Sequence, residues 1–214
     1  MKKLYIELDI IKLHKQGISL LPVGQNEIIT PLALDKIKEL GMTISSKVDV
    51  EIITPLNENS KLAPPFKVAI GCDHTGFKLK NVLIKILMEK GFKILDMGTF
   101  DEKSCDYPDY ALSVAEKVRM RLVTFGLIID ATGNPSAITA NKLAGIRAAN
   151  CYNEFTAKSA RKHNNANILT LGAKSIGEET AKSILDSWLN SNFAGGRHQR
   201  RLDKITAVEK KYLK

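Results

Sequence analysis

The sequence predicts an α/β protein, in which a parallel sheet is covered by helices on both faces and a small α+β extension precedes it. From residue 67 onward, short apolar runs alternate with longer segments whose apolar residues recur at helical spacing, which is typical of a helix-covered parallel sheet. Residues 55–65 carry the polar and proline signals of a linker. We therefore expect an N-terminal extension over residues 1–62 and a main domain over residues 66–214.

The extension shows fewer regular patterns than the main domain. Residues 3–11 are predicted to form a strand, and residues 30–41 a helix that Thr30 caps and Gly41 ends. Residues 48–53 alternate like an exposed strand. We find no internal repeat in the chain and no catalytic constellation in the extension, so we expect a role in packing, oligomerisation or docking.

The main domain is predicted to contain five strands and a helix after most of them. The strands are expected at residues 67–72, 92–97, 127–129, 146–151 and 168–171. Helices are expected at residues 77–91, around residues 111–118, at residues 155–163 and at residues 178–189. The basic tail over residues 197–214 is predicted to be helical.

Composition limits the class of protein. The chain has 214 residues, of which 44% are hydrophobic and 26% charged, and no apolar run approaches the roughly 20 residues that cross a bilayer. Glu7 and Asp9 interrupt the N-terminal stretch that a signal peptide would need, so we expect a cytoplasmic protein. Cys72, Cys105 and Cys151 are scattered and odd in number, which indicates reduced thiols rather than disulfides or a zinc site.

The formal net charge of +9 is compatible with a nucleic acid or with small anionic substrates as partners. Much of the excess lies in residues 197–214, and no zinc-finger or RNP-like signature accompanies it. We therefore expect phosphorylated metabolites and no nucleic acid, with a merely solvated helical tail as the alternative.

Asp130 and Thr132 directly follow the apolar run at residues 127–129. The carboxyl ends of parallel strands face the ligand crevice, and the next helix presents free backbone N–H groups to anions. These residues are therefore the first candidates for substrate contact. The alternative, that Asp130 only caps the following helix, is about equally consistent with the sequence.

Other polar residues stand near predicted strand ends. Asp73 and His74 follow the first strand, residues 163–165 precede the fifth, and residues 195–201 are basic. A lone histidine is more often structural than catalytic. We expect all of these groups around one sheet edge, where acid, base and anion-binding groups would then be available together.

Six segments carry a resemblance to a known family: residues 71–77, 106–108, 140–142, 145–148, 163–164 and 195–199. On these motifs, the sequence from residue 67 onward resembles the ribose-5-phosphate isomerase B and galactose-6-phosphate isomerase family. The resemblance implies a Rossmann-like aldose–ketose isomerase of phosphorylated sugars that uses no metal or organic cofactor. It also implies that two subunits complete each site.

The resemblance also assigns roles to individual positions. It implies that His163 assists ring opening and that Thr132 helps to stabilise the enediolate. Lys174 stands where family members often have an arginine, so the charge is kept and the planar fork is lost. The contacts to substrate or phosphate are assigned to Asp73, His74, Tyr107, Gly133, Ser136, Asn164, Lys174, Arg197 and Arg201.

The loop after residues 127–129 departs from the family pattern, because Asp130 stands where family isomerases have a catalytic cysteine. A carboxylate can abstract a proton next to a carbonyl if it is within reach and its basicity is raised by burial. Pro135 lacks an amide that could face the oxyanion, a loss that Ser136 could compensate. Pro135 should not disturb the fold, because proline is tolerated in the first turn of a helix.

Two functional hypotheses follow. The first is a sugar-phosphate isomerase of the ribose 5-phosphate to ribulose 5-phosphate type, with Asp130 as the proton-transfer base, in a homodimer or homotetramer with shared sites. The second is a non-catalytic or partner-dependent sugar-phosphate-binding subunit. It resembles the A subunit of galactose-6-phosphate isomerase, which also has an aspartate at this position and works beside a thiol-bearing homologue.

Overall fold

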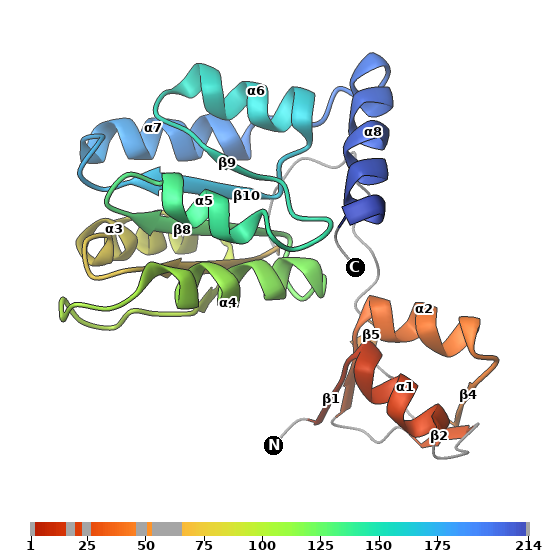
Figure 1. The fold of residues 1–214 in the computed structure, drawn as a ribbon. Coiled ribbons are helices and arrows are strands. Elements are labelled where there is room, and N and C mark those ends of the chain that lie inside the picture. The colour runs from red at the N-terminus through yellow and green to blue at the C-terminus, as the bar shows by residue number, and fades with distance from the viewer. Residues whose placement is uncertain (1–2, 16–19, 23–26, 46–50, 53–65, 213–214) are drawn as a thin grey trace. The chain divides into compact units, whose positions relative to one another are not determined.

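The computed structural model describes residues 3–15, 20–22, 27–45, 51–52 and 66–212 (Figure 1). These residues form two units, an N-terminal unit with the elements β1 to β5 and a main unit from β6 to α8. The predicted linker at residues 55–65 lies outside the described residues. No helix in the described part of the chain is long and apolar enough to cross a membrane.

The main unit is built on one sheet of five parallel strands, which confirms the predicted fold class. The strands are β6 (Lys67–Cys72), β7 (Lys93–Asp96), β8 (Phe125–Asp130), β9 (Ala148–Asn150) and β10 (Ile168–Gly172). They are ordered β7-β6-β8-β10-β9, and every neighbouring pair is parallel. Each predicted strand is present, with bounds that differ by a few residues.

Helices cover both faces of this sheet (Figure 1). They are α3 (Phe77–Glu89), α4 (Tyr107–Arg119), α5 (Asn134–Ala140), α6 (Glu154–Asn164) and α7 (Glu178–Leu189). The last helix, α8 (Arg197–Tyr212), lies beside the sheet and contacts α6. The apolar residues of α4 and α5 pack on one face. Those of α3, α6 and α7 pack on the other.

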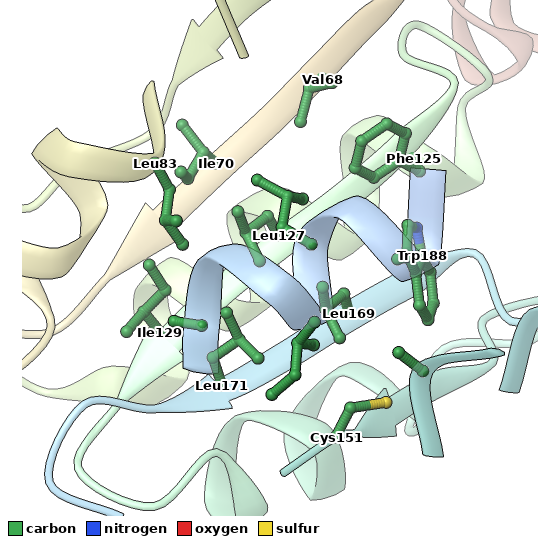
Figure 2. Packing of buried hydrophobic residues seen from close by; sticks show 14 of the residues in the cluster. Val68, Ile70, Leu83, Phe125, Leu127, Ile129, Cys151, Leu169, Leu171 and Trp188 are labelled. Atoms are coloured by element: carbon green, nitrogen blue, oxygen red, sulfur yellow. The ribbon is translucent and has the colours of Figure 1, made fainter. Parts of the chain in front are cut away.

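The central strands are mostly apolar because both of their faces are covered. Ile70, Leu127 and Ile129 pack into the cluster on the α3 and α7 side, together with Leu83 and Trp188 (Figure 2). All five side chains are fully buried. Burial of a side chain of this size contributes about 1.5–3 kcal/mol, so this layer fixes the strand order that positions the loops described below.

The strand order creates a switch point between β6 and β8. The chain leaves β6 through α3 to β7 on one side, whereas β8 lies on the other side of β6. In open α/β sheets, ligands bind at such a point outside the carboxyl ends of the strands. Asp73 follows β6 and donates its backbone N–H to the carbonyl oxygen of Ile129 at 3.1 Å, so the two strand ends are directly joined there.

The N-terminal unit consists of β1 (Lys3–Tyr5), α1 (Glu7–Lys15), β2 (Leu20–Pro22), β3 (Glu27–Ile29), α2 (Pro31–Glu39), β4 (Thr43–Ser45) and β5 (Glu51–Ile52). The predicted helix is confirmed as α2, where Thr30 accepts the N–H of Ala33. The predicted strand over residues 3–11 is wrong beyond residue 5. Asp9 accepts the N–H of Ile6 at 3.0 Å, and Ile10 is fully buried, which turns this stretch into a helix. Of the strand predicted at 48–53, only β5 is described.

The N-terminal unit also contains an internal repeat, so the expectation of none is wrong. Residues 27–32 and 51–56 have the same sequence, Glu-Ile-Ile-Thr-Pro-Leu, 24 residues apart. The strands that begin successive copies pair in parallel, with Lys3 opposite Glu27 and Ile28 opposite Glu51. Only two copies are evident from the sequence, because the segment that begins with β1 starts with Lys-Leu-Tyr and has diverged.

Candidate active site

The carboxylate of Asp130 is bound by the backbone of its own loop. Oδ1 accepts the N–H groups of Thr132 at 2.8 Å and Gly133 at 2.6 Å, and Oδ2 accepts that of Ser136 at 3.1 Å. The residue is 1% exposed. The N-cap of α5 is Gly133, and of the three N–H groups only that of Ser136 lies within the first turn of this helix. Asp130 therefore binds mainly the loop before the helix, and its contact with the helix start is limited to Ser136.

The same loop is held by neighbouring strands. Gly133 has a φ of +80°, a left-handed conformation that favours glycine, and it turns the loop amides toward Asp130. Asn150 donates to the carbonyl of Thr132 at 3.2 Å, and Thr170 donates to that of Gly133 at 2.8 Å. Pro135 lies in the first turn of α5, as predicted.

This geometry bears on the predicted role of Asp130 as a base. A general base must reach the proton that it removes, whereas both oxygens of Asp130 hold loop amides and the side chain is buried. The amides of Thr132, Gly133 and Ser136, which could otherwise bind an oxyanion, are occupied by this carboxylate. In this geometry Asp130 organises the loop, and the buried side chain already accepts three of the roughly four hydrogen bonds that a carboxylate can take.

Asp73, at the end of the neighbouring strand, is bound on one side only. Its Oδ1 accepts the N–H and Oγ1–H of Thr75 at 2.9 and 2.6 Å, and the N–H of Gly76 at 3.2 Å. Among the described residues, Oδ2 has no hydrogen-bond partner. Asp73 therefore holds its turn and still offers one carboxylate oxygen, as its predicted contact with the sugar requires.

Three more predicted residues lie at this edge of the sheet. His74 follows Asp73, is half-buried, and accepts the backbone N–H of Cys105 on Nδ1 at 3.3 Å. Tyr107 begins α4. Lys174 follows β10 with an exposed side chain, and its backbone N–H donates to Ala131 at 3.0 Å. This group is called the edge group below: Asp73, His74, Tyr107, Asp130, Thr132, Gly133, Ser136 and Lys174.

A second, cationic group surrounds the start of α8. The ring of His163, near the end of α6, stacks on that of His198 with centroids 4.4 Å apart and planes 12° apart. Burial, followed by the charges of His163, Arg197 and Arg201, lowers the pKa of His198. His163, Asn164, Arg197 and Arg201 are exposed. The name cationic group is used below for five residues: His163, Asn164, Arg197, His198 and Arg201.

The cationic group and the edge group lie at opposite ends of the sheet. His163 precedes β10 and Lys174 follows it, and a five-residue strand spans roughly 16 Å. The prediction that all these residues gather at one edge is therefore wrong for the cationic group. Its physical reason is connectivity, because a helix between parallel strands returns the chain to the end where strands begin. Within one chain, the two groups are therefore separated by the length of β10.

None of the three thiols stands in the Asp130 loop. All three are free, as predicted. Burial raises the pKa of Cys72 to about 12 and that of Cys151 to about 11, so both are protonated at neutral pH. Cys105 is half-buried and adjoins His74, with Sγ 4.0 Å from Nδ1. In the described part of the chain, no cluster of three or more His, Cys, Asp or Glu residues could hold a metal ion.

Sequence reasoning did not single out three residues that shape these groups. Asn150 fixes the Asp130 loop, Cys105 contacts His74, and His198 stacks on His163. His198 lies within the motif at residues 195–199, so the sequence did carry a signal for it. Asn150 and Cys105 act through loop contacts, and no sequence motif predicts these contacts.

Comparison with known proteins covers the main unit. Residues 68–205 match the model of the family described as Ribose/Galactose Isomerase. Ribose-5-phosphate isomerase B of Escherichia coli K12 is 44% identical over 145 residues, which cover 68% of this chain and 97% of that protein. A ribose-5-P isomerase B of Listeria innocua is also 44% identical over 145 residues, covering 68% of this chain and 98% of its own.

Solved structures show the same similarity. Ribose-5-phosphate isomerase B of Clostridium thermocellum matches with a TM-score of 0.68 and 45% identity, over 68% of this chain and 99% of its own. The enzyme from Mycoplasma genitalium, crystallised with bound ribulose-5-phosphate, matches with a TM-score of 0.66 and 40% identity, over 68% of this chain and 97% of its own.

Proposed function

Because this chain belongs to the ribose/galactose isomerase family, we propose that it takes part in the aldose–ketose isomerisation of a phosphorylated sugar through an enediolate. The proposed substrate is of the ribose 5-phosphate and ribulose 5-phosphate type. A relative at 40% identity that binds ribulose-5-phosphate supports this choice. The edge group supplies polar contacts for the sugar, and the cationic group supplies positive charge for the phosphate.

We propose that two chains build each site, in a homodimer or homotetramer or with a homologous chain. The edge group of one chain and the cationic group of another would meet there. The support is geometric, since the two groups flank opposite ends of β10. In the described residues, no ion pair with a carboxylate engages Arg197 or Arg201, so their charge is open to a phosphate.

We further propose that a thiol-bearing homologous chain moves the proton. The protein described here would then hold the sugar phosphate in the site of that homologue. The observation that carries this proposal is the closure of Asp130 on Thr132, Gly133 and Ser136. An oxyanion hole needs free donors aimed at the developing charge, and here a carboxylate already occupies them. The chain would thus complete a partner's site through Arg197 and Arg201.

The second candidate is a homomeric isomerase in which Asp130 is the base. The position of Asp130 at the end of β8, beside the switch point, favours it. In this case the substrate's oxygens must take over the loop amides, which would release the carboxylate toward C2 of the sugar. Asp130→Asn would then abolish turnover without loss of folding.

Solvent-proton exchange separates the two candidates. The purified chain is mixed with ribose 5-phosphate or galactose 6-phosphate in D2O, and deuterium at C2 is followed by NMR. We expect binding without exchange for the chain alone, and exchange once a thiol-bearing homologue is added. Exchange by the chain alone that Asp130→Asn abolishes would establish the second candidate. Absence of binding to any pentose or hexose phosphate would contradict both.

A further inference from the structure

His74 is held by a hydrogen bond that only one form of its ring can make. The backbone N–H of Cys105 donates to Nδ1 at 3.3 Å, and the Cys105 Sγ lies 4.0 Å from the same nitrogen. A ring nitrogen accepts a hydrogen bond only through a free lone pair. Nδ1 is therefore unprotonated, and the proton of the neutral ring lies on Nε2.

The segment that carries Cys105 is anchored to the end of β6. The fully buried Lys80 binds Asp96 at 2.7 Å and the carbonyl of Thr99 at 2.8 Å. Thr99 donates to the carbonyl of Cys72 at 2.9 Å, and Cys72 donates back to Gly98 at 2.7 Å. These bonds fix the start of the β7–α4 connection beside β6, the strand that His74 follows.

The other ring nitrogen of His74 remains available. Nε2 has no hydrogen-bond partner among the described residues, and the side chain is half-buried at the edge of the sheet. Oδ2 of the adjacent Asp73 is also without a partner in the described chain. The Nε2–H group of His74 can donate to a phosphate oxygen, and Oδ2 of Asp73 can accept from a hydroxyl. A phosphorylated sugar offers both groups.

We infer that Cys105 is a positioning residue whose backbone N–H fixes His74 as the Nε2–H tautomer, so that His74 offers a donor to a phosphate or sugar oxygen. The choice of ligand rests on the proposed function, whereas the tautomer does not. With the opposite tautomer, His74 would face an oxygen with a lone pair, and the contact would be repulsive. Cys105 thus acts through its main chain, and its thiol is not required.

Nitrogen-15 NMR of the labelled full chain tests the tautomer directly. The four histidines, His14, His74, His163 and His198, give separate long-range proton–nitrogen patterns, and loss of one pattern in His74→Gln assigns His74. We expect an unprotonated Nδ1 and a protonated Nε2 at neutral pH. A protonated Nδ1, or averaged shifts from two exchanging tautomers, would overturn the inference.

Two variants separate the main chain of Cys105 from its side chain. Cys105→Pro removes the N–H, so His74 should show averaged tautomers and the affinity for ribose 5-phosphate should fall by about 10-fold, the effect of one lost hydrogen bond. Cys105→Ala keeps the N–H and should leave the tautomer unchanged. If Cys105→Pro does not fold, the wild-type and Cys105→Ala spectra still decide, and a changed tautomer in Cys105→Ala would contradict the inference.

Addition of ribose 5-phosphate distinguishes this inference from the proposed function. A shift of the His74 Nε2 signal on titration, with the tautomer preserved, supports both. An Nε2–H tautomer that does not respond to ribose 5-phosphate or galactose 6-phosphate counts against the proposed function and leaves the tautomer assignment intact.

Discussion

The loops that follow β6 and β8 use the same device with different results. In each, an aspartate at the end of a strand accepts backbone N–H groups two and three residues further along. Asp73 does so with one oxygen and keeps the other open. Asp130 uses both oxygens, the second for Ser136. The loop after β6 therefore keeps a carboxylate oxygen that can accept a hydrogen bond from a ligand hydroxyl, whereas the loop after β8 is filled by its own side chain.

The comparison shows that a motif's residue types do not determine whether its amides are free. At the end of β8, the Asp130 carboxylate reaches back into its own loop. This side chain is not a thiol, and it supplies an anion that occupies the backbone N–H donors of the loop.

The largest effect is expected when the Asp130 side chain is replaced so that the loop amides are released. In Asp130→Cys, a thiol stands at the end of β8 and accepts such bonds only weakly, so the N–H groups become free. We expect the chain alone to gain C2 proton exchange by about 10²-fold or more, the scale of a restored oxyanion donor. Exchange of ribose 5-phosphate in D2O measures this gain.

Asp130→Ala is the matched control, because it frees the same amides without adding a thiol. It should show no gain over the wild-type chain. Equal rates for Asp130→Cys and Asp130→Ala would mean that the added thiol contributes nothing. If neither variant exceeded the wild-type chain, the carboxylate would not limit the loop, and the contrast between the two loops would lose its functional meaning.

A smaller effect is expected on stability. Asp130→Asn places an amide NH2 against one of the three N–H donors, which leaves a buried donor unsatisfied, so we expect a loss of about 2–3 kcal/mol in unfolding free energy. Asp73→Asn can keep its acceptor on Thr75 and Gly76 and turn its NH2 to the open side, so it should lose about 1 kcal/mol or less. Urea unfolding followed by the fluorescence of Trp188, the single tryptophan, reports on the main unit. Equal losses would show that the two carboxylates are equivalent.

The smallest effect concerns Lys174 of the edge group, which would contact the phosphate where the cationic group of a second chain meets this edge. Lys174→Arg introduces a planar fork that can bind two phosphate oxygens, so we expect the affinity for ribose 5-phosphate to rise by about 3-fold to 10-fold. Lys174→Gln is the control and should weaken binding. Calorimetric titration measures both, and an unchanged affinity in both variants would place the phosphate elsewhere.

The fold of the main unit could be predicted from the sequence because its central strands are apolar on both faces. Residues such as Ile70 and Leu127 leave no alternative to a covered parallel sheet. The N-terminal unit was harder, since a run from Leu4 to Ile11 looks like a strand until Asp9 is seen to cap a helix. Its repeat is visible in the sequence, but only as a short identical segment.

The candidate site could be predicted in composition but not in arrangement. The identities of Asp73, His74 and Arg197 followed from motifs, while the place of His163 followed from connectivity, because helices between parallel strands run against them. The position of His163 at the end where strands begin is therefore deducible from the order of strands and helices in the sequence. The closure of the Asp130 loop was not accessible in this way, because it depends on the backbone angles at Gly133.

The location of the two groups at opposite ends of β10 has a genetic consequence if two chains share each site. A chain damaged in its edge group and a chain damaged in its cationic group would, when paired, retain one intact set of partners between them. Mutations in the gene would then fall into two complementation classes, divided by which end of the sheet they strike. Coexpression of one allele from each class would restore part of the function that neither supports in isolation.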